Sequence, residues 1–423
     1  MTTIERYIYD LVKSKPWLKD LLRNIYQSVF DMLPRKKEYF AKEYQYREHF
    51  FLGFHDVQPF PPDGTKVIAQ RADIEGHMPT ENDVLHVGYF DFTDGQLGDF
   101  HPIADSYAWN FHKGCRLQWL DNTHIVFNTR KQKKPFAIIY DITRGEAQEL
   151  SFPIDSVCPG GKFATTQSYE RLEYLMPGYG YLYTKDDGFC DEKAPEKTGL
   201  FLLDLHTQNR ELIFSIADMR DDVKDAYPLA QQAFHYITHS SFSTDGRYIA
   251  CLHRFVQLSD LDARTTRLVI YDTVTKTRFA LPTEGMVSHY AWNTENQIVA
   301  YCRINGIDTH ALFTIKDNQC IGAQHIAHDR LNSDGHQSWI NSNDFITDTY
   351  PDKYRMAKLH IVNCTTEETT CLVNIYSPKQ FQTKSMYNHI ACDLHPRVSH
   401  DGKYVCYDSP RTGIRSLYIM KIQ

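Results

Sequence analysis

The sequence predicts an all-β fold, a seven-bladed β-propeller with a short N-terminal helical segment. Three observations support this prediction. Short apolar stretches alternate with turn signals from about residue 49 onward, one such unit recurs seven times, and helical periodicity is nearly absent after residue 50 except at 216–229. The units begin near residues 49, 114, 159, 235, 288, 335 and 388, and their spacing brackets the length of a four-stranded blade. Closing the sheets into a ring removes exposed strand edges, whereas two stacked sheets are the alternative arrangement.

Residues 1–45 differ from the rest of the chain. Apolar residues recur there at helical spacing between lysines and arginines: Ile8, Leu11, Val12, Leu18, Leu21, Leu22, Ile25, Val29, Phe30 and Leu33. We expect an amphipathic helical segment over 1–45 and the propeller over 46–423. The helix either caps the propeller or contacts a membrane surface or a partner protein.

The recurring unit explains the order of strands within a blade. Asp-Gly pairs follow the first strand in three units, at 63–64, 245–246 and 401–402, and predict hairpin turns. Third strands end in aspartate at 91, 141, 204 and 272. The third unit is the longest, and the Glu- and Lys-rich stretch from Asp186 to Lys197 predicts a long surface loop.

Composition limits the function classes. The net charge is −7, so we expect no nucleic-acid partner. The ten cysteines form no Cys-x-x-Cys pair, which favours free thiols in a reducing compartment. No apolar run reaches the roughly 20 residues that span a bilayer, and charges interrupt the N-terminal stretch. We therefore expect a cytoplasmic protein.

Polar residues occur where the first strand of each blade would line the central channel. Histidines start at least five of these strands, at His55, His239, His289, His336 and His395. Because blades radiate from one axis, we expect these side chains to converge at the channel mouth. Imidazoles together with carboxylates and guanidinium groups suit a divalent metal and an anionic ligand. Alternatively, these residues join neighbouring blades through hydrogen bonds.

Three further features bear on this group of polar residues, and two of them have two interpretations each. Asp348 follows His336 in the same unit and is either a turn cap or a carboxylate beside the site. The stretch 176–181, with Tyr179 and Tyr181, forms either a loop with sugar-stacking rings or a bulge with aromatic packing. Arg171 falls on the predicted first strand of the third unit.

Four stretches resemble the oligogalacturonate-lyase type of propeller and, more loosely, TolB-type propeller repeats: 240–246, 288–292, 335–339 and 395–402. The resemblance covers roughly the C-terminal half. In that lyase family a Mn²⁺ ion, held by histidines and a glutamine from adjacent blades, neutralises a uronate carboxylate. His289 and His395 fall on ligand positions. Asp393 stands where the family has a histidine, and Ile390 stands where it has the glutamine.

These departures leave open whether the ion is Mn²⁺ or Ca²⁺ and whether the lyase activity is retained. We add His336 as a supplementary ligand. The stretches 115–119 and 177–181 also resemble propellers associated with bacterial surface-polysaccharide gene sets, which suggests glycan chemistry.

The leading hypothesis is metal-assisted β-elimination on a uronic-acid-containing oligo- or polysaccharide. His289, His336, Asp393 and His395 would hold the ion. Arg171 or Arg397 would bind the carboxylate, and His55 or His239 would take the C5 proton. A glycosidase or transferase using Asp348 with Asp56 or Asp393 is the second hypothesis. A non-catalytic platform for glycan or protein binding is the third. Motifs for nucleotide binding and the Gly-x-Ser-x-Gly elbow are missing.

Overall fold

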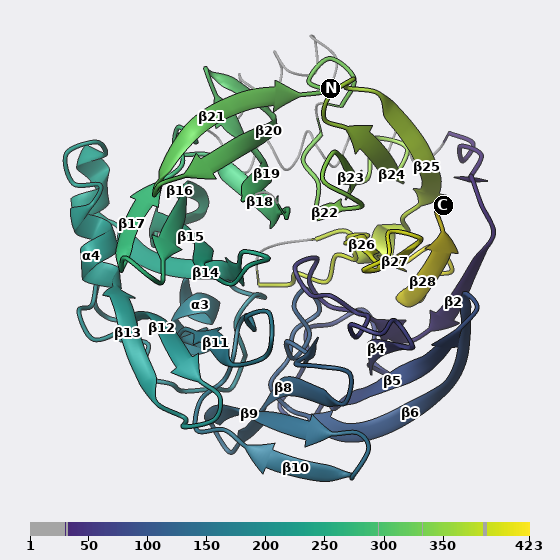
Figure 1. The fold of residues 1–423 in the computed structure, drawn as a ribbon, viewed down its shortest axis with the longest axis horizontal. Helices are drawn as coiled ribbons and strands as arrows, with labels where there is room; N and C mark the ends of the chain where they lie inside the picture. The colour runs from purple at the N-terminus through teal and green to yellow at the C-terminus, as the bar shows by residue number, and fades with distance from the viewer. Residues whose placement is uncertain (1–29, 31–32, 295, 332, 384–386) are drawn as a thin grey trace.

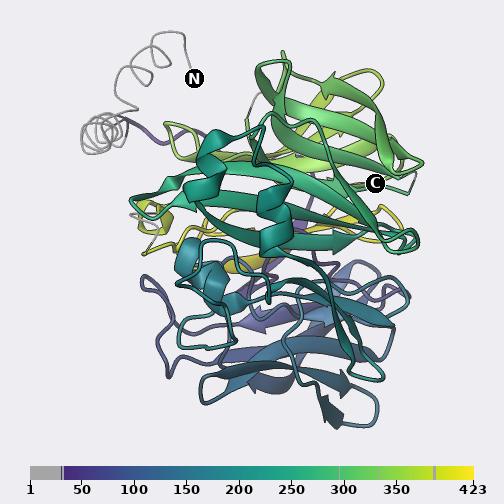
Figure 2. The same cartoon turned by 90° about the vertical axis from the view of Figure 1, so that its left-hand side faces the viewer.

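The protein is a ring of seven β-sheets around one axis, so the predicted seven-bladed β-propeller is confirmed (Figure 1). The computed structural model describes residues 30, 33–294, 296–331, 333–383 and 387–423. In the side view most strands run along the axis of the ring (Figure 2). Most of the predicted helical segment lies outside the described residues.

The first four blades follow the chain in order. Blade 1 contains β3 (Phe50–Phe51), β4 (Lys66–Arg71), β5 (Leu85–Thr93) and β6 (Gln96–Ser106). Blade 2 contains β7 (Gln118–Trp119), β8 (His124–Lys131), β9 (Lys134–Asp141) and β10 (Glu146–Glu149). Blade 3 has three strands, β11 (Phe163–Thr166), β12 (Gly199–Asp204) and β13 (Arg210–Ser215). Blade 4 contains β14 (Phe234–Phe242), β15 (Tyr248–Gln257), β16 (Asp260–Asp272) and β17 (Thr277–Ala280).

The last three blades complete the ring. Blade 5 contains β18 (Val287–Trp292), β19 (Gln297–Ile304), β20 (Ile307–Lys316) and β21 (Gln319–Ile326). Blade 6 contains β22 (Gln337–Trp339), β23 (Asp344–Asp348), β24 (Met356–Asn363) and β25 (Thr369–Tyr376), with β1 (Tyr39–Phe40) at its edge. Blade 7 contains β26 (Arg397–Val398), β27 (Tyr404–Ser409) and β28 (Ser416–Lys421), with β2 (Tyr44–Glu48) outermost.

Strand β2 closes the ring. It pairs antiparallel with β28, from Tyr44 opposite Met420 to Glu48 opposite Ser416. The Tyr46 ring stacks on the Tyr418 ring with centroids 5.1 Å apart. Strands β1 and β2 therefore extend the sheet structure back to residue 39, before the expected boundary at 46.

The turns explain how each blade reverses direction. Gly64, Gly246 and Gly402 each follow an aspartate and have φ values of 67°, 75° and 72°, in the left-handed region that glycine adopts most readily. At the same end of the blades, Asp141 and Asp272 accept hydrogen bonds from backbone amides of the turns that follow their strands.

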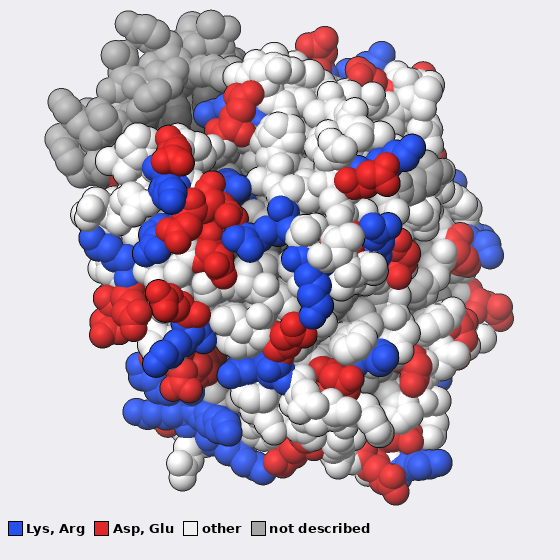
Figure 3. Space-filling view, turned by 60° about the vertical axis from the view of Figure 1, so that its left-hand side comes forward, with Lys and Arg blue, Asp and Glu red and all other residues white. Residues whose placement is uncertain are grey.

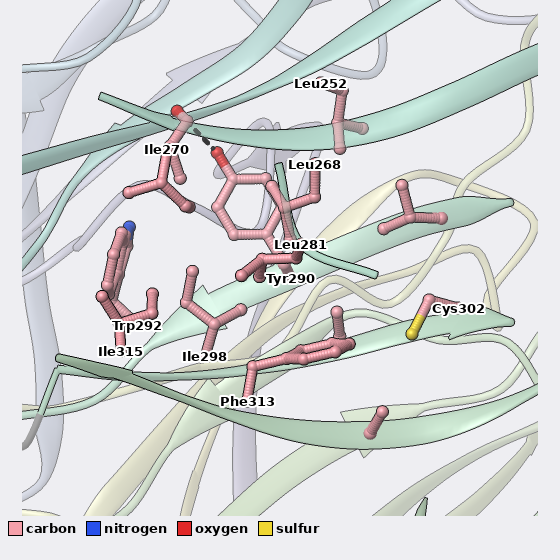
Figure 4. Packing of buried hydrophobic residues seen from close by; sticks show 14 of the residues in the cluster. Leu252, Leu268, Ile270, Leu281, Tyr290, Trp292, Ile298, Cys302, Phe313 and Ile315 are labelled. Carbon is pink, nitrogen blue, oxygen red and sulfur yellow. Dashed lines mark hydrogen bonds between the residues drawn. The ribbon is translucent and has the colours of Figure 1, made fainter. Parts of the chain in front are cut away.

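Apolar side chains fill the spaces between adjacent sheets. Between blades 4 and 5, for example, Ile270 of β16 and Phe313 of β20 belong to the same buried cluster as Tyr290 and Trp292 of β18 (Figure 4). The Tyr290 hydroxyl donates to the Ala250 carbonyl at 3.0 Å and also to the His239 carbonyl. This packing fixes the first strands relative to one another at the ring axis.

Blade 3 departs from the regular pattern. Between β11 and β12 the chain forms helix α3 (Tyr169–Leu175) and then the irregular stretch 176–198. Helix α4 (Ile216–Asp221) and the 3₁₀ helix η1 (Pro228–Gln232) lie where the sequence has helical periodicity. A short 3₁₀ helix, η2 (Lys379–Phe381), follows blade 6.

The cysteines and the surface charges do not indicate a particular ligand or partner. All ten cysteines are free. Basic and acidic side chains lie side by side across the face seen in Figure 3. Within the part of the chain that the structure describes, no helix has the length and apolarity to cross a membrane.

Candidate functional site

Five histidines from five blades meet at the ring axis. The ring centroid of His336 lies 3.9 Å from that of His289, 4.2 Å from that of His395 and 5.1 Å from that of His55. The His239 centroid lies 6.3 Å from that of His289. The five side chains are all buried, and the structure therefore brings together the residues that the repeat phase placed at the channel mouth.

Local backbone geometry directs two of these side chains inward. His239 and His395 have φ values of 55° and 43°, in the left-handed region that is unfavourable for residues other than glycine. At His239 the pairing of β14 with β15 shifts register between Thr238 and Ser241, as at a bulge. Strained backbone of this kind concentrates at functional sites.

Three of the histidines are oriented through Nδ1. His395 Nδ1 lies 2.9 Å from the Gly53 carbonyl oxygen, to which it donates. His336 Nδ1 lies 2.9 Å from Asp348 Oδ1, and His289 Nδ1 lies 3.3 Å from Asp334 Oδ1. An acceptor at Nδ1 holds the proton there and leaves the Nε2 lone pair for a metal ion.

His336, Asp393 and His395 form the tightest group of possible ligands. One ligand atom from each lies within 4.8 Å of the other two. His395 Nε2 is buried without a hydrogen-bond partner in the described part of the chain, 4.0 Å from Asp393 Oδ2. This orphaned nitrogen, the nearby carboxylate and the Nδ1 contacts fit a divalent ion, so the residues present suit the metal that the lyase resemblance implies. His289 lies outside this three-residue group but its ring is adjacent to His336.

Burial controls protonation in this cluster. It holds the pKa values of His55, His239 and His395 well below the usual histidine value, with neighbouring cations and imidazoles acting in the same direction. His336 differs: burial opposes its charge, but the carboxylates of Asp348, Asp393 and Asp334 together outweigh burial and raise its pKa. Burial also raises the pKa of Asp393 to about 6. Neutral imidazoles are the form that binds metals and accepts protons.

The structure contradicts the carboxylate-binding role predicted for Arg397. Its side chain is 2% exposed. Nε donates to the Phe54 carbonyl at 2.8 Å, Nη1 to the His395 carbonyl at 2.6 Å, and Nη2 to the Gly53 carbonyl. All three nitrogens are thus engaged with the backbone, and Arg397 supports the loops that carry His55 and His395.

The prediction for Arg171 is wrong for a similar reason. Arg171 lies on α3 and not on a first strand, because Ser168 caps this helix through its hydroxyl. Its guanidinium donates to backbone carbonyls, at 2.7 Å to His235 and 2.8 Å to Phe189, among others. These bonds anchor the segment 176–198 of blade 3 and leave no pair of free guanidinium N–H groups for a substrate carboxylate.

A second group of rings borders the metal-ligand group. The Tyr179 ring stacks on His112 with centroids 4.7 Å apart and planes 9° apart, and it lies 5.9 Å from the His239 centroid. His112 and His389 are hydrogen-bonded to each other. From sequence the stretch 176–181 was either a loop with sugar-stacking rings or a bulge with aromatic packing, and its position beside the histidines depends on α3.

Two of the carboxylates in the glycosidase hypothesis are engaged by other groups of the protein. Asp348 accepts from the backbone N–H groups of His336 at 2.7 Å and His395 at 2.9 Å. Asp56 forms a bidentate pair with Arg116, at 2.8 and 2.9 Å. Both carboxylates are therefore engaged as positioning groups.

Comparison with solved structures supports the fold. The chain is similar to oligogalacturonate lyase from Vibrio parahaemolyticus, with a TM-score of 0.57 and 11% identity over 92% of this chain and 99% of the other. Its fold resembles that lyase's fold. TolB from Acinetobacter baumannii (TM-score 0.39, 12% identity, 84% and 80% coverage) and the tricorn protease (0.48, 12%, 89% and 33%) are also similar. No protein-family model and no curated protein sequence matches the chain.

Proposed function

We propose that the histidine cluster is a divalent-metal centre and that the protein cleaves a uronic-acid-containing glycan by β-elimination. The observation that carries this proposal is the group of His336, Asp393 and His395, whose ligand atoms lie within 4.8 Å of one another. His289 adds an imidazole whose ring centroid lies 3.9 Å from that of His336. The fold likeness to an oligogalacturonate lyase is consistent with the proposal.

The chemistry needs charge neutralisation next to a base. A bound divalent ion would neutralise the uronate carboxylate and stabilise the charge that develops at C5. His239 Nε2, which is buried without a hydrogen-bond partner among the described residues, accepts the C5 proton. The C–H electron pair then forms the C4–C5 double bond as the C4–O bond breaks, and the leaving oxygen takes up a proton from solvent water, while His239 later returns its proton to solvent. His55 is the alternative base.

The orienting contacts explain how the chain holds this geometry. Asp348, Asp334 and the Gly53 carbonyl fix the rings of His336, His289 and His395. Tyr179 lies beside His239, where its ring supplies a surface on which a sugar stacks.

Metal analysis combined with an activity assay tests the proposal. We expect purified protein to retain stoichiometric Mn²⁺ or Ca²⁺, and His395→Ala to lose it. With uronate oligosaccharides we expect ultraviolet absorbance from unsaturated products, abolished by EDTA and restored by the metal. His86→Ala, a change at an exposed histidine, serves as the matched control. Metal retained equally by His395→Ala, or no product from a broad uronate panel, would overturn the proposal.

A further inference from the structure

Arg254 is a buried cation without an anionic partner. It lies on β15 opposite Tyr236 of β14, and its side chain is 5% exposed. Nη1 donates to the Met176 sulfur at 3.1 Å, a weak acceptor. Nε is buried and has no hydrogen-bond partner within the described ranges. No described carboxylate lies within ion-pair distance of its guanidinium.

Other buried cations near the axis are paired. Lys113 Nζ lies 2.8 Å from Asp155 Oδ1, and the Arg116 guanidinium forms its bidentate pair with Asp56. Arg397 and Arg171 donate to backbone carbonyls. Burying a charge without an anionic partner is strongly destabilising. A buried guanidinium that contacts the Met176 sulfur and the Tyr236 hydroxyl but no described carboxylate therefore points to an anion that arrives from outside the chain.

The position of Arg254 connects it to the histidine cluster. Its contact residue Met176 leads directly into the segment that carries Tyr179, whose ring faces His239. The charge of Arg254 contributes to the lowered pKa values of both His239 and His289. Arg264 on β16 adds a second positive charge to the same region. Arg254 therefore adds positive charge beside the predicted base, His239.

We propose that Arg254 is a specificity-determining residue that binds an anionic group of a bound sugar, in the first place a carboxylate, next to Tyr179. The planar guanidinium matches the two oxygens of a carboxylate, and its buried position strengthens each charge-assisted hydrogen bond. This inference rests on the proposed function, because it places a glycan at the channel mouth. It replaces Arg171 and Arg397 as the source of carboxylate recognition.

Binding measurements test this role separately from catalysis. We would titrate digalacturonate, neutral digalactose and a sulfated disaccharide into manganese-treated wild type and Arg254→Gln. We expect wild type to bind digalacturonate at least tenfold more tightly than digalactose, and Arg254→Gln to lose that preference while its Mn²⁺ content is unchanged. Tighter binding of the sulfated sugar would identify sulfate as the anion. An acidic preference that is absent in wild type, or equal in the variant, would overturn the inference.

Thermal unfolding without ligand gives an independent readout. Because the variant removes a buried charge that has no described anionic partner, we expect Arg254→Gln to raise the unfolding midpoint, by about 1 °C for each kcal/mol in a chain of this size. Arg247→Gln, which breaks the 2.7 Å ion pair with Asp272 in the same blade, should give no rise. A lower midpoint for Arg254→Gln would assign Arg254 a structural role. Failure of wild type to retain Mn²⁺ would count against the proposed metal centre and not against Arg254.

Discussion

The histidines of the site differ in the groups that hold them in place. His395 and His336 both offer Nε2, yet one is held by a backbone carbonyl and the other by a carboxylate. Asp348 is central to this difference because it binds His336 through both its ring and its backbone and also binds the His395 backbone. A single buried carboxylate thus positions two ligands from two blades.

Replacing Asp348 by asparagine tests this positioning role. The change removes the charge that orients His336 and leaves one amide N–H group facing a backbone donor. We expect Mn²⁺ affinity to fall by about ten- to a hundred-fold, as for other groups that orient metal ligands. Titration calorimetry of EDTA-treated protein measures it. Asp204→Asn, at the outer end of β12, is the control and should bind Mn²⁺ like wild type. Equal affinities for all three proteins would contradict the assigned role.

Among the secondary-structure elements, α3 and the segment after it determine what covers the histidines. The Glu173 carboxylate accepts from the Gly178 and Gly180 backbone N–H groups at 3.0 and 3.2 Å. These bonds fold the chain back over α3 and place Tyr179 beside the site. Burial raises the pKa of Glu173 to about 7, so the same group that shapes the loop is costly to ionise.

This pKa predicts a pH-dependent contribution to stability. Between pH 4.5, the ordinary glutamate value, and pH 7 the folded protein keeps a proton that the unfolded chain has released. Stability from this group therefore falls as pH rises through that window. We expect the unfolding free energy of Glu173→Gln, relative to wild type, to rise by up to roughly 3 kcal/mol from pH 5 to pH 8. Denaturant titration measures it, with exposed Glu146→Gln as the control. A difference that does not change with pH would contradict the expectation.

At the scale of the whole molecule, ring closure links the two ends of the described chain. Strand β2 supplies the outer edge of blade 7, whose inner end carries His395 and Arg397. Asp393 lies in the connection from β25 to β26, which leads into the inner strand of blade 7. The integrity of the site therefore depends on a strand far away in sequence.

Removing β2 should weaken both stability and metal binding. We would compare a chain that begins at Glu38 with one that begins at His49, which lacks β1 and β2. The loss of about five backbone hydrogen bonds at about 1 kcal/mol each predicts an unfolding free energy lower by at least about 4 kcal/mol, together with weaker Mn²⁺ binding. Denaturant titration and metal analysis check this. Equal stability of the two chains would show that closure does not depend on β2.

The sequence predicts the blades and the histidine cluster well because both follow from repetition. Because the first strand of every repeat lies at the ring axis, equivalent positions in the repeats come close together. The repeats therefore predict, without knowledge of any contact, a cluster of these histidines: His55, His239, His289, His336 and His395. It does not predict where a guanidinium points, so Arg171 and Arg397 were assigned to substrate although backbone carbonyls hold them. The cap at Ser168 and the apolar spacing of Tyr169, Leu172 and Leu175 could have identified α3.

Other features depend on distant pairing and have no local signal. Tyr44–Glu48 alternates like a strand, but its partner lies about 370 residues away, and short local patterns do not specify partners at that separation. Arg254 was missed because its importance lies in the carboxylate that it lacks. Such a residue becomes visible only when the hydrogen-bond and ion-pair partners of each buried polar group are known.

The late partner of β2 also affects how the protein is made. At the usual rates of translation, roughly 20 to 70 seconds pass between synthesis of Tyr44–Glu48 and synthesis of β28. During that interval the nascent chain carries an edge strand without its mate, open to wrong partners on neighbouring polypeptides. Molecular chaperones that shield this segment at the ribosome would therefore influence the yield of native protein more than they would influence its final stability.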